Sequence, residues 1–272
     1  MTETVEKAEE FISVTGPKKY ITLYIGEFEL PLVTQTTITL IVCTALLILA
    51  AWLLTRSITK RPSGKQVIVE KLVNMLYGLV RDTMGEHNLR FAPYIGTLFL
   101  SSLTCTLLGM TGILRSATAD LSVTMAWALV TTGLVWYHTI KANGFGSWLK
   151  GFTEPVVVMT PMNIVSEIAQ PLSMAFRHFG NVAGGSVLTT LIYAALAGLS
   201  SLLFSWLPGA VAGLIPPVFQ VGIPAVLSVY FDLFSGFVQA FVFCLLTMVY
   251  VGSACPPPEK VEEEEPATTE AD

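Results

Sequence analysis

The sequence has 272 residues, of which 53% are hydrophobic and only 13% are charged. Soluble globular domains carry about 25% charged residues, so this composition excludes an ordinary soluble domain and predicts an integral membrane protein. The formal net charge is −5, and no basic patch points to nucleic acid as a partner. The cysteines lie far apart, without the spacing of a metal site, and we interpret them as free thiols: Cys43, Cys105, Cys244 and Cys255.

Residues 1–32 are expected to form an external polar lead-in and surface segment. Residues 1–19 are rich in Glu and Lys and lack the apolar core of a cleaved signal peptide. Residues 20–32 alternate weakly between apolar and polar and are interrupted by Gly26 and Pro31, a pattern that indicates a small hairpin at the membrane surface.

A first membrane span is expected at residues 33–54, because a bilayer crossing needs roughly 20 apolar residues. Basic residues follow it closely: Arg56, Lys60, Arg61, Lys65 and Lys71. Cytoplasmic loops carry the excess of Lys and Arg, so this end is expected inside and the N-terminus outside. Residues 67–82 repeat apolar side chains at helical period, which predicts an amphipathic helix on the cytoplasmic face, with a soluble linker helix as the alternative.

The next two spans are expected at residues 93–113 and 121–140, as an antiparallel pair joined by the short outer loop 114–120. Lys141 and Lys150 again mark the cytoplasmic side, and Trp136, Tyr137 and Trp148 suit an interfacial aromatic belt. The predicted orientation is therefore consistent along the chain.

A helix over residues 162–204 would be too long to stand upright in a hydrocarbon core of about 30 Å, so it is expected to be tilted. A last helix is expected at 225–252, after an outer turn rich in Pro and Gly. Residues 33–255 thus form the membrane domain, with a tilted hairpin at about 162–253, and residues 256–272 an acidic disordered tail. The predicted fold is an all-α integral membrane protein with five membrane-embedded helices, three upright and two in the hairpin, plus the amphipathic helix.

Arg177 is the most informative residue, because it lies deep in apolar sequence. No charged residue occurs from Phe179 to Phe231, and Glu167 is roughly 15 Å away along a helix. An arginine at mid-bilayer costs about 2.5 kcal/mol or more, so such a residue usually faces water, a carboxylate or an ion path. Snorkelling of the side chain to the headgroups is the alternative.

Small and polar residues share one helical face with Arg177: Gln170, Ser173, Asn181 and Gly184. Gly180 and Gly184 form a small-xxx-small pair, which in membranes lets a second helix approach closely. Helix packing alone would explain these glycines, but it would not explain Arg177.

The block from 166 to 185 resembles the signature of subunit a of bacterial rotary F-type ATP synthases. The matching residues are Pro171, Ser173, Arg177, Phe179, Gly180 and Asn181. Residues 238–250, with Gln239, and residues 118–124 resemble two further stretches of that family, so that the similarity runs from about residue 20 to 255. Two positions depart from the family pattern: Ser186 replaces an acidic residue or histidine, and His178 replaces a leucine. We interpret His178 as a packing or lipid-interface residue rather than a relay.

The resemblance implies a stator with two offset ion half-channels against the c-ring, a ring of hairpin subunits that each carry an essential carboxylate. Arg177 would be the essential charge between the half-channels. The outer half-channel would contain Asn181, Gln239, Asp232 and Ser186, with Asp120 as a further candidate; the inner one would contain Asn163, Ser166, Glu167 and Ser173. Proton and sodium ion both remain open as the transported ion.

The resemblance also implies the bacterial plasma (inner) membrane as location, and the c-ring, the peripheral-stalk b subunits and membrane lipid as partners. It implies no cofactor and no nucleotide site in this chain. The competing hypothesis is a secondary transporter or channel that holds an anionic substrate with the arginine. That hypothesis predicts internal repeats, which the sequence does not show. A structural scaffold would leave Arg177 unexplained.

Overall fold

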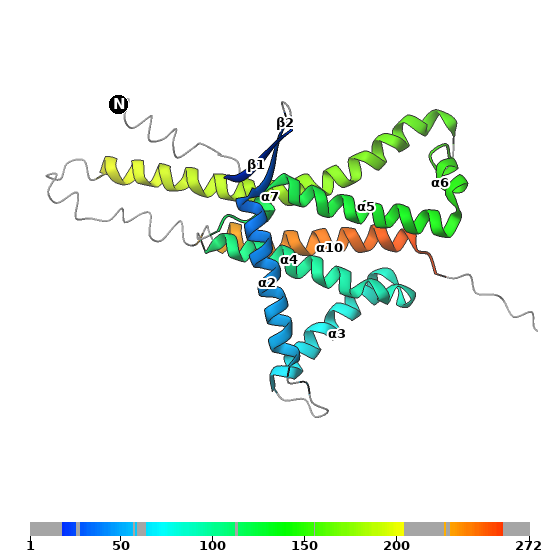
Figure 1. Cartoon of the computed structure of the whole chain (residues 1–272), viewed down its shortest axis with the longest axis horizontal. Helices are drawn as coiled ribbons and strands as arrows, with labels where there is room; N and C mark the ends of the chain where they lie inside the picture. Colours follow the sequence, from blue (N-terminus) through cyan, green and yellow to red (C-terminus); the bar gives the residue numbers. More distant parts are fainter. Residues whose placement is uncertain are drawn as a thin grey trace, which may run out of the picture.

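The computed structural model describes residues 18–25, 28–56, 58, 64–111, 114–154, 156–203, 226 and 229–257 (Figure 1). The predicted lead-in before residue 18, the acidic tail after residue 257 and most of the expected outer turn lie outside the described residues. Within them the chain is mainly helical, and the long helices α4, α5 and α10 run beside one another across the molecule.

A two-stranded antiparallel sheet precedes the first helix and consists of β1 (Lys19–Ile25) and β2 (Phe28–Thr34). Ile25 is opposite Phe28 at the turn end of the hairpin, and an ion pair of 3.0 Å joins Lys19 of β1 to Glu29 of β2. The predicted hairpin is confirmed. The hairpin is a small addition to a mainly helical chain, which agrees with the predicted all-α membrane class. Pairing between the two strands satisfies their backbone hydrogen-bonding groups.

Helix α2 (Gln35–Thr55) begins at a capping box formed by Thr34 and Thr37, and its length matches the first predicted span. Large apolar side chains along it, such as Ile41 and Ile48, are exposed, as expected for a helix that contacts lipid. Helix α3 (Gly64–Met84) packs into the core at Val80 and Met84 and exposes apolar side chains over its first half. This distribution fits an amphipathic helix at a membrane surface.

Helix α4 (Ala92–Met110) follows the 3-10 helix η1 (Glu86–Phe91). Helix α5 (Leu121–Asn143) follows the short 3-10 helix η2 (Ala117–Ala119) and begins at Asp120, whose side chain accepts a hydrogen bond from the amide of Ser122. The short helix α6 (Phe145–Gly151) and the 3-10 helix η3 (Val157–Met159) lead to the next long helix. These bounds agree with the second and third predicted helices.

Helix α7 (Thr160–Leu203) has 44 residues and extends across most of the width of Figure 1. At 1.5 Å per residue it is about 66 Å long, twice the thickness of a hydrocarbon core, and it therefore agrees with the expected long helix. Pro171 lies inside α7 and removes one backbone hydrogen bond from it.

The last helix differs from its prediction at the start. Helix α10 (Ser235–Ala254) is α-helical, but the preceding turns, η4 (Val229–Phe234), form a π-helix. The described residues of the last predicted helix are therefore helical, but its first described turns are π-helical rather than α-helical. π-Helical turns contain about one residue more than α-helical turns, and they are frequent at functional sites.

Four helical segments among the described residues are long and apolar enough to cross a membrane: Gln35–Thr55, Glu86–Met110, Val157–Leu196 and Ser235–Ala254. Helix α5 is 23 residues long but is not among them. Threonines such as Thr124, Thr131 and Thr132, which lie buried against neighbouring helices, lower its hydropathy. The chain is therefore a helical multi-pass membrane protein.

The main core lies where α4, α5, α7 and α10 meet, with the end of α3 beside them. Ile95, Ala128, Met174 and Phe243, one from each helix, are almost fully buried there. A second, smaller cluster joins α2 to α4 through Cys43 and Cys105. All four cysteines are free thiols, as predicted.

Candidate functional site

Helix α7 has a buried face and an exposed face around Arg177. Pro171, Met174, Ala175 and His178 are buried against the other helices. The stripe defined by Ser173, Arg177, Asn181 and Gly184 is exposed. The arginine therefore points away from the core of its own chain, on the side of α7 that the described residues leave uncovered.

His178 fixes the rotation of α7 about its axis. Its side chain is 1% exposed, and Nε2 lies 3.1 Å from the hydroxyl of Ser102 on α4. The imidazole also makes edge contacts with Trp127 on α5 and Phe243 on α10, at centroid distances of 6.0 and 5.3 Å. Since His178 contacts three helices, the packing interpretation agrees with its position, and the neighbouring Arg177 is directed outward.

Asn181 and Gln239 are the pair of predicted site residues that the fold brings into direct contact. Asn181 Nδ2 donates a 2.9 Å hydrogen bond to Gln239 Oε1, across the α7–α10 interface. Gln239 is 3% exposed, and its Nε2 has no hydrogen-bond partner among the described residues. A buried amide donor in a folded protein is nearly always satisfied by protein or by ordered water. Asn181 lies one helical turn beyond Arg177 on the same face of α7.

The two glycines of the small-xxx-small pair leave open space beside the arginine. A Cβ atom at Gly180 or Gly184 would meet no other atom within 4 Å, and both glycines are exposed. Gly236 on α10 is different, because a Cβ there would lie 2.5 Å from Thr106 Cγ2 on α4. Gly236 thus serves packing within this chain, whereas Gly180 and Gly184 do not contact any described part of it closely.

The four residues predicted for the inner half-channel occupy the first third of α7. Asn163 Nδ2 donates to the carbonyls of Phe152 and Glu154, at 2.9 and 3.0 Å, and so holds the preceding loop. Glu167 Oε1 accepts a hydrogen bond from the indole of Trp136 on α5. Ser166 and Ser173 are exposed. Asn163 and Asn181 are roughly 27 Å apart along the helix, so these residues approach the arginine from the opposite end to Asn181.

The remaining residues predicted for the outer half-channel are Asp120, Ser186 and Asp232. Both carboxylate oxygens of Asp120 are bonded, Oδ1 to the amide of Ser122 at 3.0 Å and Oδ2 to the hydroxyl of Thr36 at 2.8 Å. Ser186 is exposed and donates to the carbonyl of Ala183 at 2.8 Å. Asp232 lies in the π-helix η4, seven residues before Gln239.

Sequence reasoning missed three residues that position this site: Ser102, Trp127 and Thr106. Ser102 and Thr106 lie one helical turn apart in α4 and are buried, with exposed fractions of 1% and 5%. In the sequence, these two residues stand out only as hydroxyl side chains within an otherwise apolar run. That pattern does not show which residue on another helix each side chain contacts. Ser102 pairs with a residue 76 positions away, which periodicity within one helix does not reveal.

Together these features present a fixed positive charge, the amide of Asn181 and two small residues on an outward face inside a membrane segment, with Gln239 buried beside the amide. An exposed guanidinium flanked by glycines can meet a carboxylate on a helix that approaches this face. The amide pair beside it, formed by the exposed Asn181 and the buried Gln239, can stabilise water or a hydrated ion. The arrangement suits the movement of ions along a partner protein.

Sequence comparison shows which known proteins this chain is similar to. The family model of the ATP synthase A chain matches residues 36–252. A sodium-ion-specific ATP synthase subunit a from Propionigenium modestum is 33% identical over 217 residues, which cover 74% of this chain and 67% of that protein. ATP synthase subunit a of Desulforamulus reducens is 34% identical over 209 residues, covering 76% and 74% of the two chains. That of Anoxybacillus flavithermus is 30% identical over 233 residues, covering 82% and 91%. This chain therefore belongs to the ATP synthase subunit a family.

Proposed function

We propose that this chain is the stator subunit of the membrane motor of a rotary ATP synthase, which couples the flow of protons or sodium ions to ring rotation and ATP synthesis. The observation that carries the proposal is the orientation of α7. His178 is held in the core by Ser102, and this directs Arg177 to an exposed face inside a membrane segment. Family membership supports this role over that of a secondary transporter or channel.

The partner of the exposed face is the c-ring. Gly180 and Gly184 leave room for a neighbouring helix at the level of Arg177, since side-chain atoms of this chain do not fill the space beside them. Small residues permit close approach of two helix backbones in membranes. A carboxylate on a ring helix can thus come within reach of the guanidinium.

Arg177 acts through its charge. A ring carboxylate that passes the guanidinium is stabilised in its ionised form, so it releases its ion before it meets the arginine and accepts another only after it. The same fixed charge repels cations that would otherwise cross directly between the two half-channels. Each elementary charge that moves through 100 mV supplies about 2.3 kcal/mol, and several ring steps supply the energy for one ATP.

We assign the outer half-channel to the side of Asn181 and Gln239. The unpartnered Nε2 of Gln239 favours water at this position, because leaving a buried donor unsatisfied costs about 1–3 kcal/mol. Asp232 and Ser186 belong to the same side, and Asp120 lies farther out with a capping role. Asn163, Ser166, Glu167 and Ser173 are assigned to the inner half-channel, where Ser166 and Ser173 are exposed.

The proposed topology has five membrane-embedded helices: α2, α4 and α5 upright, then α7 and α10 as a tilted hairpin, with α3 on the cytoplasmic face. The basic residues after α2 and at the ends of α5 and α6 support an outer N-terminus and a cytoplasmic C-terminus. Residues 1–32 are the external segment, 33–255 the membrane domain and 256–272 a solvated tail. Peripheral-stalk b subunits complete the stator.

The proposal is tested with Arg177→Ala in the complete complex, reconstituted in vesicles under an imposed ion gradient. We expect ATP synthesis to fall to that of vesicles without the complex, because the charge that empties each ring carboxylate is gone. Arg177→Lys should also be severely impaired, since an ammonium lacks the planar guanidinium fork. Arg56→Ala, which removes a cation at the end of α2, is the matched control and should retain synthesis. Substantial synthesis by an assembled Arg177→Ala complex would refute the role.

A further inference from the structure

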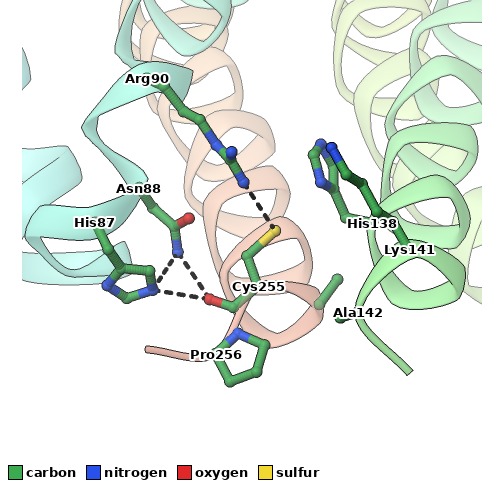
Figure 2. Close-up of a pocket in the computed structure, with 9 residues that line it drawn as sticks. His87, Asn88, Arg90, His138, Lys141, Ala142, Cys255 and Pro256 are labelled. Carbon is green, nitrogen blue, oxygen red and sulfur yellow. Dashed lines mark hydrogen bonds between the residues drawn. The ribbon is translucent and has the colours of Figure 1, made fainter. Parts of the chain in front are cut away.

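A basic pocket of about 410 Å³ lies at the end of the helix bundle away from the hairpin β1–β2, where α5 and α10 both terminate. In Figure 2, Arg90 extends from η1 towards Cys255, and His138 and Lys141 lie on the other side, on α5. The volume is within the range of small-ligand sites, roughly 300–1,000 Å³. It is lined by His87, Asn88, Arg90, His138, Lys141, Ala142, Ala254, Cys255 and Pro256, none of them acidic.

One wall of the pocket is structural. His87 Nε2 lies 2.8 Å from the carbonyl oxygen of Cys255, and Asn88 Nδ2 donates to the same oxygen at 3.0 Å. Asn88 is completely buried and also donates to the carbonyl of Met84 at 3.0 Å. These bonds fasten η1 to the C-terminal end of α10 and satisfy its free carbonyl. The wall is therefore rigid and leaves Arg90 and Lys141 as the pocket's permanent cations.

Arg90 and Lys141 are not neutralised within the described part of the chain, where neither forms an ion pair with a carboxylate. Glu86, the acidic residue of η1, pairs instead with Arg81 at 3.3 Å. Arg90 makes a 3.9 Å contact with Cys255 Sγ and stacks over Phe91, and Lys141 lies 5.9 Å from the ring centre of Tyr137. The C-terminal end of α5 stabilises a cation such as Lys141 through the helix dipole. The dipole of α5 does not account for the position of Arg90 on η1 or for the cavity between the two side chains.

The surroundings of the pocket are those of a membrane–water interface. Tyr137 is 59% exposed one turn before Lys141, and Phe145 is 62% exposed just after α5 ends. Exposed aromatic rings beside exposed cations are typical of the headgroup level of a bilayer. Basic pockets between transmembrane helices on the cytoplasmic side bind the headgroups of anionic lipids. A lipid phosphate could enter this pocket while its acyl chains remain beside the apolar helix faces.

We infer that the pocket between η1, α5 and α10 binds the phosphate of an anionic membrane phospholipid, through Arg90 and Lys141. This site is separate from the ion path and does not depend on Arg177. Its lipid ties η1, which joins α3 to α4, to the ends of α5 and α10. The acidic tail of the chain starts beside Pro256 and is the competing occupant, but its charge would have to leave water, whereas a lipid phosphate is already at this depth.

The test uses the complete ATP synthase complex in phosphatidylcholine vesicles with a trace of phosphatidylglycerol that carries a photoreactive group near its headgroup. After irradiation, mass spectrometry measures labelling of the peptides that contain Arg90 and Lys141. We expect strong labelling that unlabelled phosphatidylglycerol displaces and inorganic phosphate at the same concentration does not. Equal labelling by a photoreactive phosphatidylcholine, or displacement by inorganic phosphate, would overturn the lipid assignment.

Two double variants distinguish lipid binding in this pocket from a general attraction of anionic lipid to exposed cations. Arg90→Gln with Lys141→Gln should reduce labelling by about fivefold for each removed charge, roughly 25-fold together. Lys71→Gln with Lys150→Gln removes two exposed charges outside the pocket and should leave labelling unchanged. An equal decrease in both pairs would overturn the proposal. Labelling that appears only after truncation of the chain at Pro258 would assign the pocket to the acidic tail instead, and would overturn it too.

Discussion

The imidazole of His178 and the hydroxyl of Ser102 form a buried contact of 3.1 Å between α7 and α4, next in sequence to the exposed Arg177. Consecutive residues of a helix point about 100° apart, so anchoring one of them sets the direction of the other. The His178–Ser102 contact thus helps to set the face of α7 on which Arg177 lies.

This relationship predicts the behaviour of two single variants and their combination. His178→Leu should lower the stability of the purified complex by about 1–3 kcal/mol, because the buried Ser102 hydroxyl loses its partner. Adding Ser102→Ala should restore most of that loss, since replacing both partners with apolar groups is nearly neutral. Thermal denaturation of the four proteins measures the coupling. If the losses of stability in the two single variants simply add up in the double variant, the His178–Ser102 contact does not contribute to stability. ATP synthesis should persist in the double variant.

Because the space beside Arg177 is open, we expect a large side chain at Gly184 to impair ATP synthesis without disturbing the fold of this chain. Gly184→Leu meets no atom of the chain within 4 Å, so the subunit should be made and inserted normally. The leucine would occupy the space through which a ring helix approaches, and ATP synthesis should fall severely or the ring should fail to associate.

Gly133→Leu provides the control for that substitution, because Gly133 is an exposed helical glycine of α5 that also has open space around it. It should leave synthesis unchanged. Copurification of the ring on native gels distinguishes loss of assembly from loss of turnover. Normal synthesis with Gly184→Leu would contradict the assignment of this face to the ring.

If water reaches Gln239, a cysteine at this position should react with a water-soluble reagent even though the side chain is buried within this chain. Gln239 is 3% exposed and the native Cys244, on the same helix, is 2% exposed. In a chain without native cysteines, Gln239→Cys should react with a hydrophilic thiol reagent added from the outer side, because the half-channel brings water to it.

Cys244, kept as the sole cysteine, should stay unreactive, as should a lipid-facing cysteine introduced at Val249. Labelling rates are read from the mass of the intact subunit. Equal inertness at position 239 would remove Gln239 from the outer half-channel.

The predicted orientation has a simple topological test. A reporter that is active only outside the cytoplasm should be silent when fused after Asp272, and active when fused before the first membrane helix. Basic residues that follow α2 at Arg56, Lys65 and Lys71 favour this arrangement, since positively charged loops stay in the cytoplasm. The reverse pattern of activity would invert the assignment of inner and outer half-channels.

Much of the architecture could be predicted from local sequence. The bounds of α2, α4 and α5 differ from the expected spans by only a few residues. These helices are defined by local features: the length of an apolar run, the charged residues that follow it, and a cap residue such as Thr34 or Asp120. The hairpin of β1 and β2 was also indicated by its alternation and its breakers. The π-helical start of the last helix was not, since its irregular turns depend on packing against α4 and α7.

The sequence by itself determined that Arg177 lies within a membrane segment and shares a stripe with Ser173, Asn181 and Gly184, because helical periodicity follows from residue spacing. It did not determine whether that stripe faces inward or outward. Only the tertiary structure decided this, through contacts between residues distant in sequence: His178 with Ser102, and Asn181 with Gln239, 58 positions apart. Periodicity defines the faces of a helix, but which face is buried depends on the free energy of packing against other helices.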